Sequence, residues 1–209
     1  MQTRRSMLLR ASGIALASVP LVVVASTATP ATRFEACPDG LTVADTETGL
    51  LWERKTTSGG VRDVSNRYSW SSPGTAADGT AYTVFLATLN TAPGFAGHTD
   101  WRLPIISELQ SILIGSGVTT VSTNVDPPDP AMGTNPTAQA TTCGASPCID
   151  ADFAAIGGPT SSSVYLSASI STTVPNNAWL VLFSNGDVFS GFKTGVTFVR
   201  AVRVGSCSS

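Results

Sequence analysis

Charged side chains are scarce in this chain of 209 residues. They make up 12% of it, about half the usual share for a soluble domain, and Ser and Thr are plentiful instead. Three of the 12 basic residues lie within residues 1–31, which contain no acidic residue. The other nine are set against 14 acidic residues. The remainder of the chain is therefore acidic, which argues against a nucleic-acid-binding protein or a polybasic membrane-binding segment.

Long uninterrupted apolar runs are also missing. Residues 1–31 have a basic start, an apolar stretch and then small residues, which is the order of a signal peptide. Three residues interrupt the apolar stretch and make it a poor membrane-spanning helix: Gly13, Ser18 and Pro20. The pair Arg4-Arg5 is typical of a twin-arginine export signal, and a general secretory signal is the alternative. We expect an exported domain over residues 32–209, without a transmembrane segment, in the periplasm, at the cell surface or secreted.

Signatures of catalysis are few. His98 is the only histidine, and neither the G-x-S-x-G nor the H-E-x-x-H pattern occurs. A histidine acting as a general base needs an acid partner and a nucleophile nearby. His98 instead lies in the polar segment GHTD, and a loop residue packing near Trp101 is the favoured interpretation. The sequence predicts no catalytic residue and no cofactor, and it favours a binding protein over an enzyme.

Four cysteines are present, and an even number in an exported protein favours disulfides. Of the three possible connectivities we favour Cys37–Cys207, which would join the two ends of the domain, with Cys143–Cys148, which would close the short CGASPC loop. A zinc site is the alternative, and the absence of a histidine near these cysteines makes it weak.

Hydrophobic patterning predicts the elements of the first half. Residues 41–54 form two extended runs around a polar turn, with Leu50, Leu51 and Trp52 pointing into a core. Residues 76–90 are expected to be helical, and five of them fall roughly on one face: Ala77, Ala81, Val84, Phe85 and Leu89. Pro104 ends an extended segment, and a second helix is expected over Ser107–Leu113, with Gly115 as its stop.

The C-terminal third has the pattern of an antiparallel sheet. A strand is expected over Val164–Ser167 and a last one over Phe198–Val204. Between them, residues 178–189 predict a hairpin, because Asn185-Gly186 separates two apolar runs. The long segment over residues 116–147, rich in Ser, Thr and Pro, is expected to be a surface loop.

Five segments in this order resemble the Lcl C-terminal domain family, named for the C-terminal domain of a bacterial collagen-like adhesin. They are LTVADTETGLLWER, GHTDWRLPIISELQSI, VYLSAS, AWLVLFSNGDV and FVRAVR, and they span most of residues 33–205. The resemblance implies an α+β, C-type-lectin-like domain with an antiparallel sheet, one or two helices, long loops and its two chain ends paired in a sheet. It gives a structural role to eight residues: Trp52, Asp100, Trp101, Arg102, Pro104, Glu108, Arg200 and Arg203.

The same segments are distantly similar to formylglycine-generating enzyme domains, through Arg102-Leu103-Pro104 and Glu108, which look architectural in that family. The chain departs from the Lcl pattern at two positions. Leu166 replaces a Trp. Ile105 replaces the polar residue that would cap the helix, a change that costs about 1 kcal/mol.

Three groups of side chains are candidates for binding. Tyr165, Trp179, Asn185 and Asp187 would line a carbohydrate surface, unless Trp179 belongs to the core and Asn185-Gly186 is only a turn. Asp126 and Asp129 would hold calcium, but two carboxylates fall short of its six to eight oxygen ligands and a plain turn is favoured. Asp100, Arg102 and Glu108 would form a charged cluster, for which a partly buried ion pair is favoured over a catalytic pair.

These observations predict a non-catalytic binding or adhesion domain whose partner is a glycan or a surface protein. The namesake's preference for sulfated polysaccharide transfers poorly, because this acidic domain has only two lysines, Lys55 and Lys193. A neutral glycan is therefore the expected sugar. The alternatives are a structural subunit of an envelope assembly and, less favoured, an enzyme related to the formylglycine-generating group. The sequence leaves the oligomeric state open.

Overall fold

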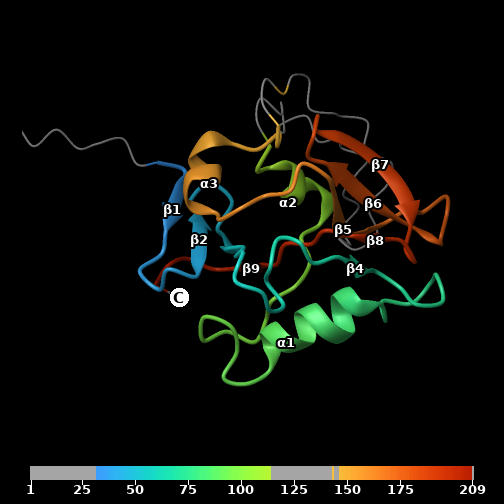
Figure 1. The fold of residues 1–209 in the computed structure, drawn as a ribbon, viewed down its shortest axis with the longest axis horizontal. Helices are drawn as coiled ribbons and strands as arrows, with labels where there is room; N and C mark the ends of the chain where they lie inside the picture. Colours follow the sequence, from blue (N-terminus) through green and yellow to red (C-terminus); the bar gives the residue numbers. More distant parts are fainter. Residues whose placement is uncertain (1–31, 114–142, 144–145, 209) are drawn as a thin grey trace, which may run out of the picture. The chain divides into compact units, whose positions relative to one another are not determined.

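The computed structural model describes residues 32–113, 143 and 146–208 (Figure 1). The first half of this part contains β1 (Phe34–Ala36), β2 (Thr42–Asp45), β3 (Leu50–Glu53), β4 (Tyr68–Ser69), the π-helix η1 (Ala81–Leu86), α1 (Ala87–Asn90) and α2 (Ile106–Gln110). The second half contains α3 (Ala151–Ile156), β5 (Val164–Ile170), β6 (Asn177–Leu182), β7 (Asp187–Phe192), β8 (Val196–Thr197) and β9 (Val202–Val204). The protein is therefore an α+β domain with short helices.

One sheet joins the two ends of the domain. Its strand order is β1-β2-β3-β9, and all of its neighbours are antiparallel. The β2–β3 hairpin confirms the two extended runs expected over residues 41–54, and Leu50, Leu51 and Trp52 are buried as expected. Beside this sheet the disulfide Cys37–Cys207 confirms the favoured pairing and ties the first strand to the end of the chain.

A second sheet has the order β5-β6-β7 and contains the expected hairpin. Leu182 pairs with Asp187, and Gly186 between them has a φ of 84°, which a residue without a Cβ adopts without strain. The strand expected over Val164–Ser167 is longer and continues to Ile170.

The last strand is shorter than expected and covers only Val202–Val204. Before it, the chain forms the short strand β8, which pairs with β4. The side chain of Arg200 then points into the interior, where backbone carbonyls accept its hydrogen bonds. Phe198 itself pairs with β5 and not with β3: its N–H donates to Val164 and its carbonyl accepts from Leu166, at 2.9 Å each.

The helix expected over residues 76–90 begins only at Ala81. The preceding Gly79 packs so closely on Ser69 that a Cβ would collide with the Ser69 carbonyl oxygen. Its N–H donates to the carbonyl of Trp70, at 3.0 Å, and not to a residue four positions earlier as in a helix. Val84 is 47% exposed and Ala77 lies outside the helix, so the expected apolar face is wrong at these two positions. The helix expected over Ser107–Leu113 is confirmed in part as α2, with Ser111–Leu113 in a turn. Gly115 lies outside the described residues.

Side chains of β6 alternate between two hydrophobic clusters. Trp179 and Val181 belong to one, with Trp52 and Phe153, whereas Leu180 belongs to the other. Figure 1 shows α2 next to β5 and β6, and α3 next to β1, as their contacts require. Of the helices described, none is long and apolar enough to cross a membrane.

Candidate functional site

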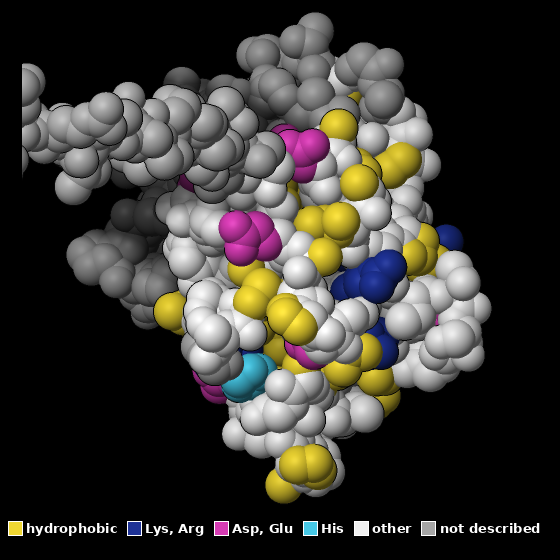
Figure 2. Space-filling model, turned by 90° about the vertical axis from the view of Figure 1, so that its left-hand side faces the viewer, with side chains coloured by type: hydrophobic (Ala, Val, Ile, Leu, Met, Phe, Trp, Pro, Cys, Tyr) yellow, Lys and Arg dark blue, Asp and Glu magenta, His cyan; other side chains and the backbone are white. Residues whose placement is uncertain are grey.

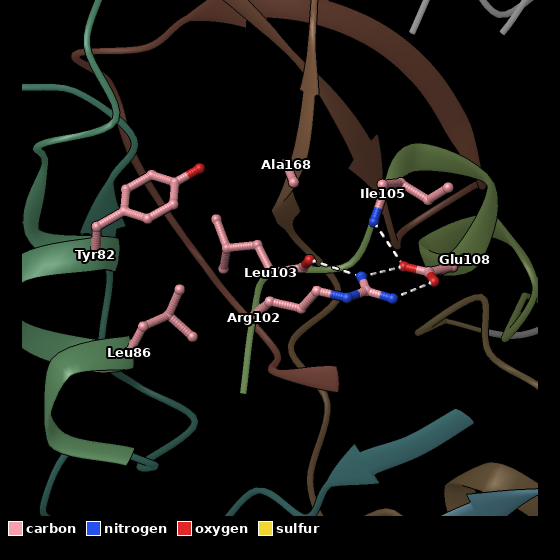
Figure 3. A pocket seen from close by; sticks show the side chains of 7 residues that line it. All are labelled: Tyr82, Leu86, Arg102, Leu103, Ile105, Glu108 and Ala168. Carbon is pink, nitrogen blue, oxygen red and sulfur yellow. Dashed lines mark hydrogen bonds and ion pairs between the residues drawn. The ribbon is translucent and has the colours of Figure 1, made fainter. Parts of the chain in front are cut away.

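A cleft of about 270 Å³ lies where the chain enters α2. Figure 3 shows the side chains that line it: Tyr82, Leu86, Arg102, Leu103, Ile105, Glu108 and Ala168. Most of this lining is apolar, and its polar groups are one ion pair and one phenol hydroxyl. A concave site with an apolar wall and a few fixed polar groups is the usual form of a small-ligand site. We call it the Arg102–Glu108 cleft.

Backbone hydrogen bonds hold the segment that forms the floor of this cleft. Arg102 exchanges two of them with Val202 of β9, at 3.0 and 2.9 Å. Two residues later the carbonyl of Pro104 accepts from Ala168 of β5, at 2.7 Å. The segment is thus clamped between the two main sheets, and its side chains project from a rigid base.

Arg102 and Glu108 form a two-point ion pair across one side of the cleft. Nη1 and Nη2 of Arg102 lie 2.7 and 2.6 Å from the two carboxylate oxygens of Glu108. The same carboxylate accepts from the backbone N–H of Ile105, at 2.8 Å, at the start of α2. Glu108 therefore supplies a reverse cap at the helix start, where Ile105 has no side-chain acceptor to offer.

The ion pair leaves N–H donors of Arg102 available. Hydrogen bonding to Glu108 raises the pKa of Arg102, and partial burial opposes the rise. Arginine has five N–H donors, and the contacts of Arg102 within the described structure use three: two to Glu108 and one to the Leu103 carbonyl. The side chain of Arg102 is 40% exposed, so its remaining donors can reach a ligand.

The opposite wall of the cleft carries an aromatic ring. Tyr82 of η1 packs edge-on against Trp70, with ring centroids 5.4 Å apart, and Leu86 lies one turn further along the same helix. Burial raises the pKa of the Tyr82 hydroxyl, so that it stays protonated and can both donate and accept. Tyr82, Leu86 and Ala168 were not expected as site residues. The only sequence signal for Tyr82 and Leu86 was the helical pattern over residues 76–90, and Ala168 directly follows the strand expected over Val164–Ser167.

A separate group of charges is buried in the interior. Lys55 lies 3.3 Å from the carboxylate of Glu53, which is fully buried. Nη1 of Arg200 donates to the carbonyls of Glu53 and Gly157, at 2.9 and 2.8 Å. Burial lowers the pKa of Lys55 to about 8, and the nearby carboxylate of Glu53 only partly offsets that effect. These contacts join β3 to the segments before β5 and β9.

The structure does not assemble the expected carbohydrate surface. Tyr165 and Trp179 are buried in the core, at 1% and 6% exposure, so neither ring has a free face. Asn185 and Asp187 bond to each other in the hairpin turn, at 2.6 Å between side chains. Trp179 thus belongs to the core and Asn185 to a turn, which was the alternative to a carbohydrate surface.

The expected charged cluster divides into two ion pairs. Arg102 pairs with Glu108, whereas Asp100 pairs with Arg203, at 2.7 Å. Asp126 and Asp129 lie outside the described residues. His98 is half-buried, and its backbone N–H donates to Phe95, whose ring packs against Trp101.

Mixed chemistry covers the face that carries His98. Figure 2 shows Asp and Glu side chains at separate places on it, and Lys and Arg side chains as well, among hydrophobic and uncharged groups. Among the residues described, there is no group of three or more His, Cys, Asp and Glu side chains that could hold a metal ion.

The disulfide Cys143–Cys148 confirms the second favoured pairing.

The fold and the cleft together define an α+β domain with a preformed, ligand-sized site beside its sheets. The model of the Lcl C-terminal domain family matches residues 41–203. The chain belongs to the Lcl C-terminal domain family. Searches of curated proteins and of solved structures found no match, so the C-type-lectin-like topology stays a prediction.

Proposed function

We propose that the protein is an exported binding domain and that the Arg102–Glu108 cleft holds a neutral sugar residue of a glycan. A pyranose presents a C–H face and a rim of hydroxyl groups. The cleft offers the Tyr82 ring on one wall, and planar hydrogen-bonding groups on the other. This juxtaposition of an aromatic side chain with a fixed Arg–Glu pair is the observation that carries the proposal.

The charge of the cleft favours a neutral ligand. The carboxylate of Glu108 already balances the guanidinium of Arg102 at 2.6 to 2.7 Å. Because the two charges lie side by side, the pair gives neither an anionic nor a cationic sugar a net attraction. A neutral sugar can use the remaining N–H groups of Arg102 and the hydroxyl of Tyr82 without breaking the ion pair.

The proposal is tested by screening the oxidised protein against a glycan array and measuring the affinity for any hit by calorimetry. Tyr82→Ala removes the aromatic wall, and we expect it to weaken binding at least about tenfold, since one well-placed aromatic side chain contributes more than 1 kcal/mol. Phe192→Ala is the matched control. It removes an aromatic side chain that is 74% exposed and lies outside the cleft, and binding should be unchanged.

Binding that survives Tyr82→Ala and is lost in Phe192→Ala would move the site away from the cleft. A blank array, with stable co-purification of an envelope protein from the native host, would instead favour the structural-subunit hypothesis.

A further inference from the structure

A second pocket has a different chemistry. It has a volume of about 330 Å³ and lies between the turn before β2, the segment after β3 and the loop after α3. We call it the arginine pocket, and its lining comprises Gly40, Leu41, Arg54, Lys55, Thr56, Thr57, Ser58, Arg62, Gly158 and Pro159. Three of these residues are basic and none is acidic, although acidic residues outnumber basic ones in the whole chain by 14 to 12.

Two arginine side chains in this pocket are held in place by the backbone. Nη1 of Arg54 donates to the carbonyl of Gly40, at 3.1 Å. Nη1 of Arg62 donates to the carbonyl of Arg54, at 2.8 Å, and its guanidinium lies 4.3 Å from the ring centre of Phe95. Neither arginine forms an ion pair with any carboxylate in the described part of the chain. Because they are anchored, binding an anion would cost them little side-chain entropy.

Nearby charges limit how much negative charge the pocket accepts. The ammonium of Lys55 already pairs with Glu53. The carboxylate of Asp63 closes the loop between Arg54 and Arg62, where it accepts from the backbone of Gly59 at 2.7 Å. Two further charges lie beside the lining and offset each other: Nη2 of Arg200 donates to the carbonyl of Pro159, at 3.4 Å, and the carboxylate of Asp39 accepts from the backbone N–H of Leu41, at 2.7 Å. The three basic residues of the lining therefore exceed Glu53 and Asp63 by one charge, which suits a single negative charge better than a double one.

We propose that the arginine pocket binds a monoanionic carboxylate group of a small ligand, with Arg54 and Arg62 as its paired donors. Guanidinium groups match the planar, two-oxygen geometry of a carboxylate. The hydroxyls of Thr57 and Ser58, which also line the pocket, supply further donors. This pocket shares no lining residue with the Arg102–Glu108 cleft. Carboxylate binding here therefore does not depend on sugar binding in that cleft.

The test is an NMR titration of the isotope-labelled, oxidised protein with sodium acetate, sodium sulfate and sodium chloride at equal ionic strength. We expect acetate to shift the Nε–H signals of Arg54 and Arg62 along a saturable curve, and chloride to leave them in place. The variants Arg54→Gln and Arg62→Gln should each weaken acetate binding at least about fivefold, because each removes one charged donor. Arg67→Gln is the control, since Arg67 lies outside this pocket and loses the same charge.

Three results would overturn the proposal. Equal shifts in acetate and chloride would show only a general salt effect. Saturation with sulfate but not with acetate would contradict the monoanionic class. An equal loss in Arg67→Gln would show that net charge, not the pocket, governs binding. Far-ultraviolet circular dichroism of each variant verifies that it folds, and Arg54→Lys, which keeps the charge without the fork, should retain part of the affinity.

Discussion

At the scale of single residues, burial keeps the pKa of Lys55 at about 8, although Glu53 lies 3.3 Å from its ammonium. In the unfolded chain the same group has a pKa near 10.5. Between these two values the unfolded state binds more protons than the folded state, so the free energy of unfolding rises with pH. From pH 8 to pH 9.5 we expect a gain of about 1.5 kcal/mol, measured by urea unfolding.

The control for this prediction is Lys55→Met, which removes the titrating group but keeps an unbranched side chain. Its free energy of unfolding should rise clearly less over the same pH range, because only Lys193, whose pKa burial also lowers, still adds to the rise there. An NMR titration that places the midpoint of the Lys55 ammonium near 10.5 would contradict the prediction. The range stops at pH 9.5 because tyrosines of the unfolded chain begin to lose protons above it.

At the scale of elements, α3 depends on the residue that precedes it, Asp150. The Asp150 carboxylate accepts from the backbone N–H groups of Asp152 and Phe153, at 2.9 and 3.3 Å. This cap holds the short helix so that Phe153 packs edge-on against Trp52 and Phe34. Asp150→Ala should lower the free energy of unfolding by about 1 kcal/mol, measured by urea unfolding followed through tryptophan fluorescence. Asp152→Ala removes an exposed carboxylate from the same turn without removing the cap, and an equal loss there would refute the capping role.

Elements with a clear local signal were predictable from the sequence. The β2–β3 and β6–β7 hairpins were predicted, because apolar runs and the turn residues between them determine a hairpin locally. The helix α3 was missed although Asp150 stands at its start, because six residues are too few for a periodic pattern. The β4–β8 pair was missed as well, since it joins two-residue strands far apart in the chain.

The candidate site was predictable only in part. The resemblance gave Arg102 and Glu108 a structural role, and the ion pair favoured for the charged cluster is present between these two. Tyr82 was not predicted, because its place in the cleft depends on how η1 packs against the floor segment, which no local pattern encodes. Tyr165 and Trp179 were expected to line a sugar surface but are buried. Side chains that are apolar with one polar end suit either place, and tertiary packing puts these two in the core.

At the scale of the whole domain, few regular elements hold a long chain together. Strands β1 and β9 lie at the two sequence ends of the described domain yet belong to one sheet, and Arg102 joins that sheet to the second one through Pro104 and α2. Such pairings of distant segments carry a large closure entropy. A covalent link between the ends lowers that cost, because it limits the conformations of the unfolded chain.

The last prediction compares the two disulfides. Cys37–Cys207 spans 170 positions of sequence, whereas Cys143–Cys148 spans 5. In the chain-entropy model the long closure stabilises the fold by about 5 kcal/mol and the short one by about 2 kcal/mol. The double variant Cys37→Ser/Cys207→Ser should therefore lose clearly more free energy of unfolding in urea than Cys143→Ser/Cys148→Ser. Cys37 and Cys148 are both buried, at 5% and 0% exposure, so a buried serine hydroxyl adds to the loss in each variant. The alanine pairs Cys37→Ala/Cys207→Ala and Cys143→Ala/Cys148→Ala remove that effect from the comparison. If both alanine pairs lost the same amount, the strand pairings β1–β2 and β3–β9, and not the covalent closure, would be holding the two ends of the domain together.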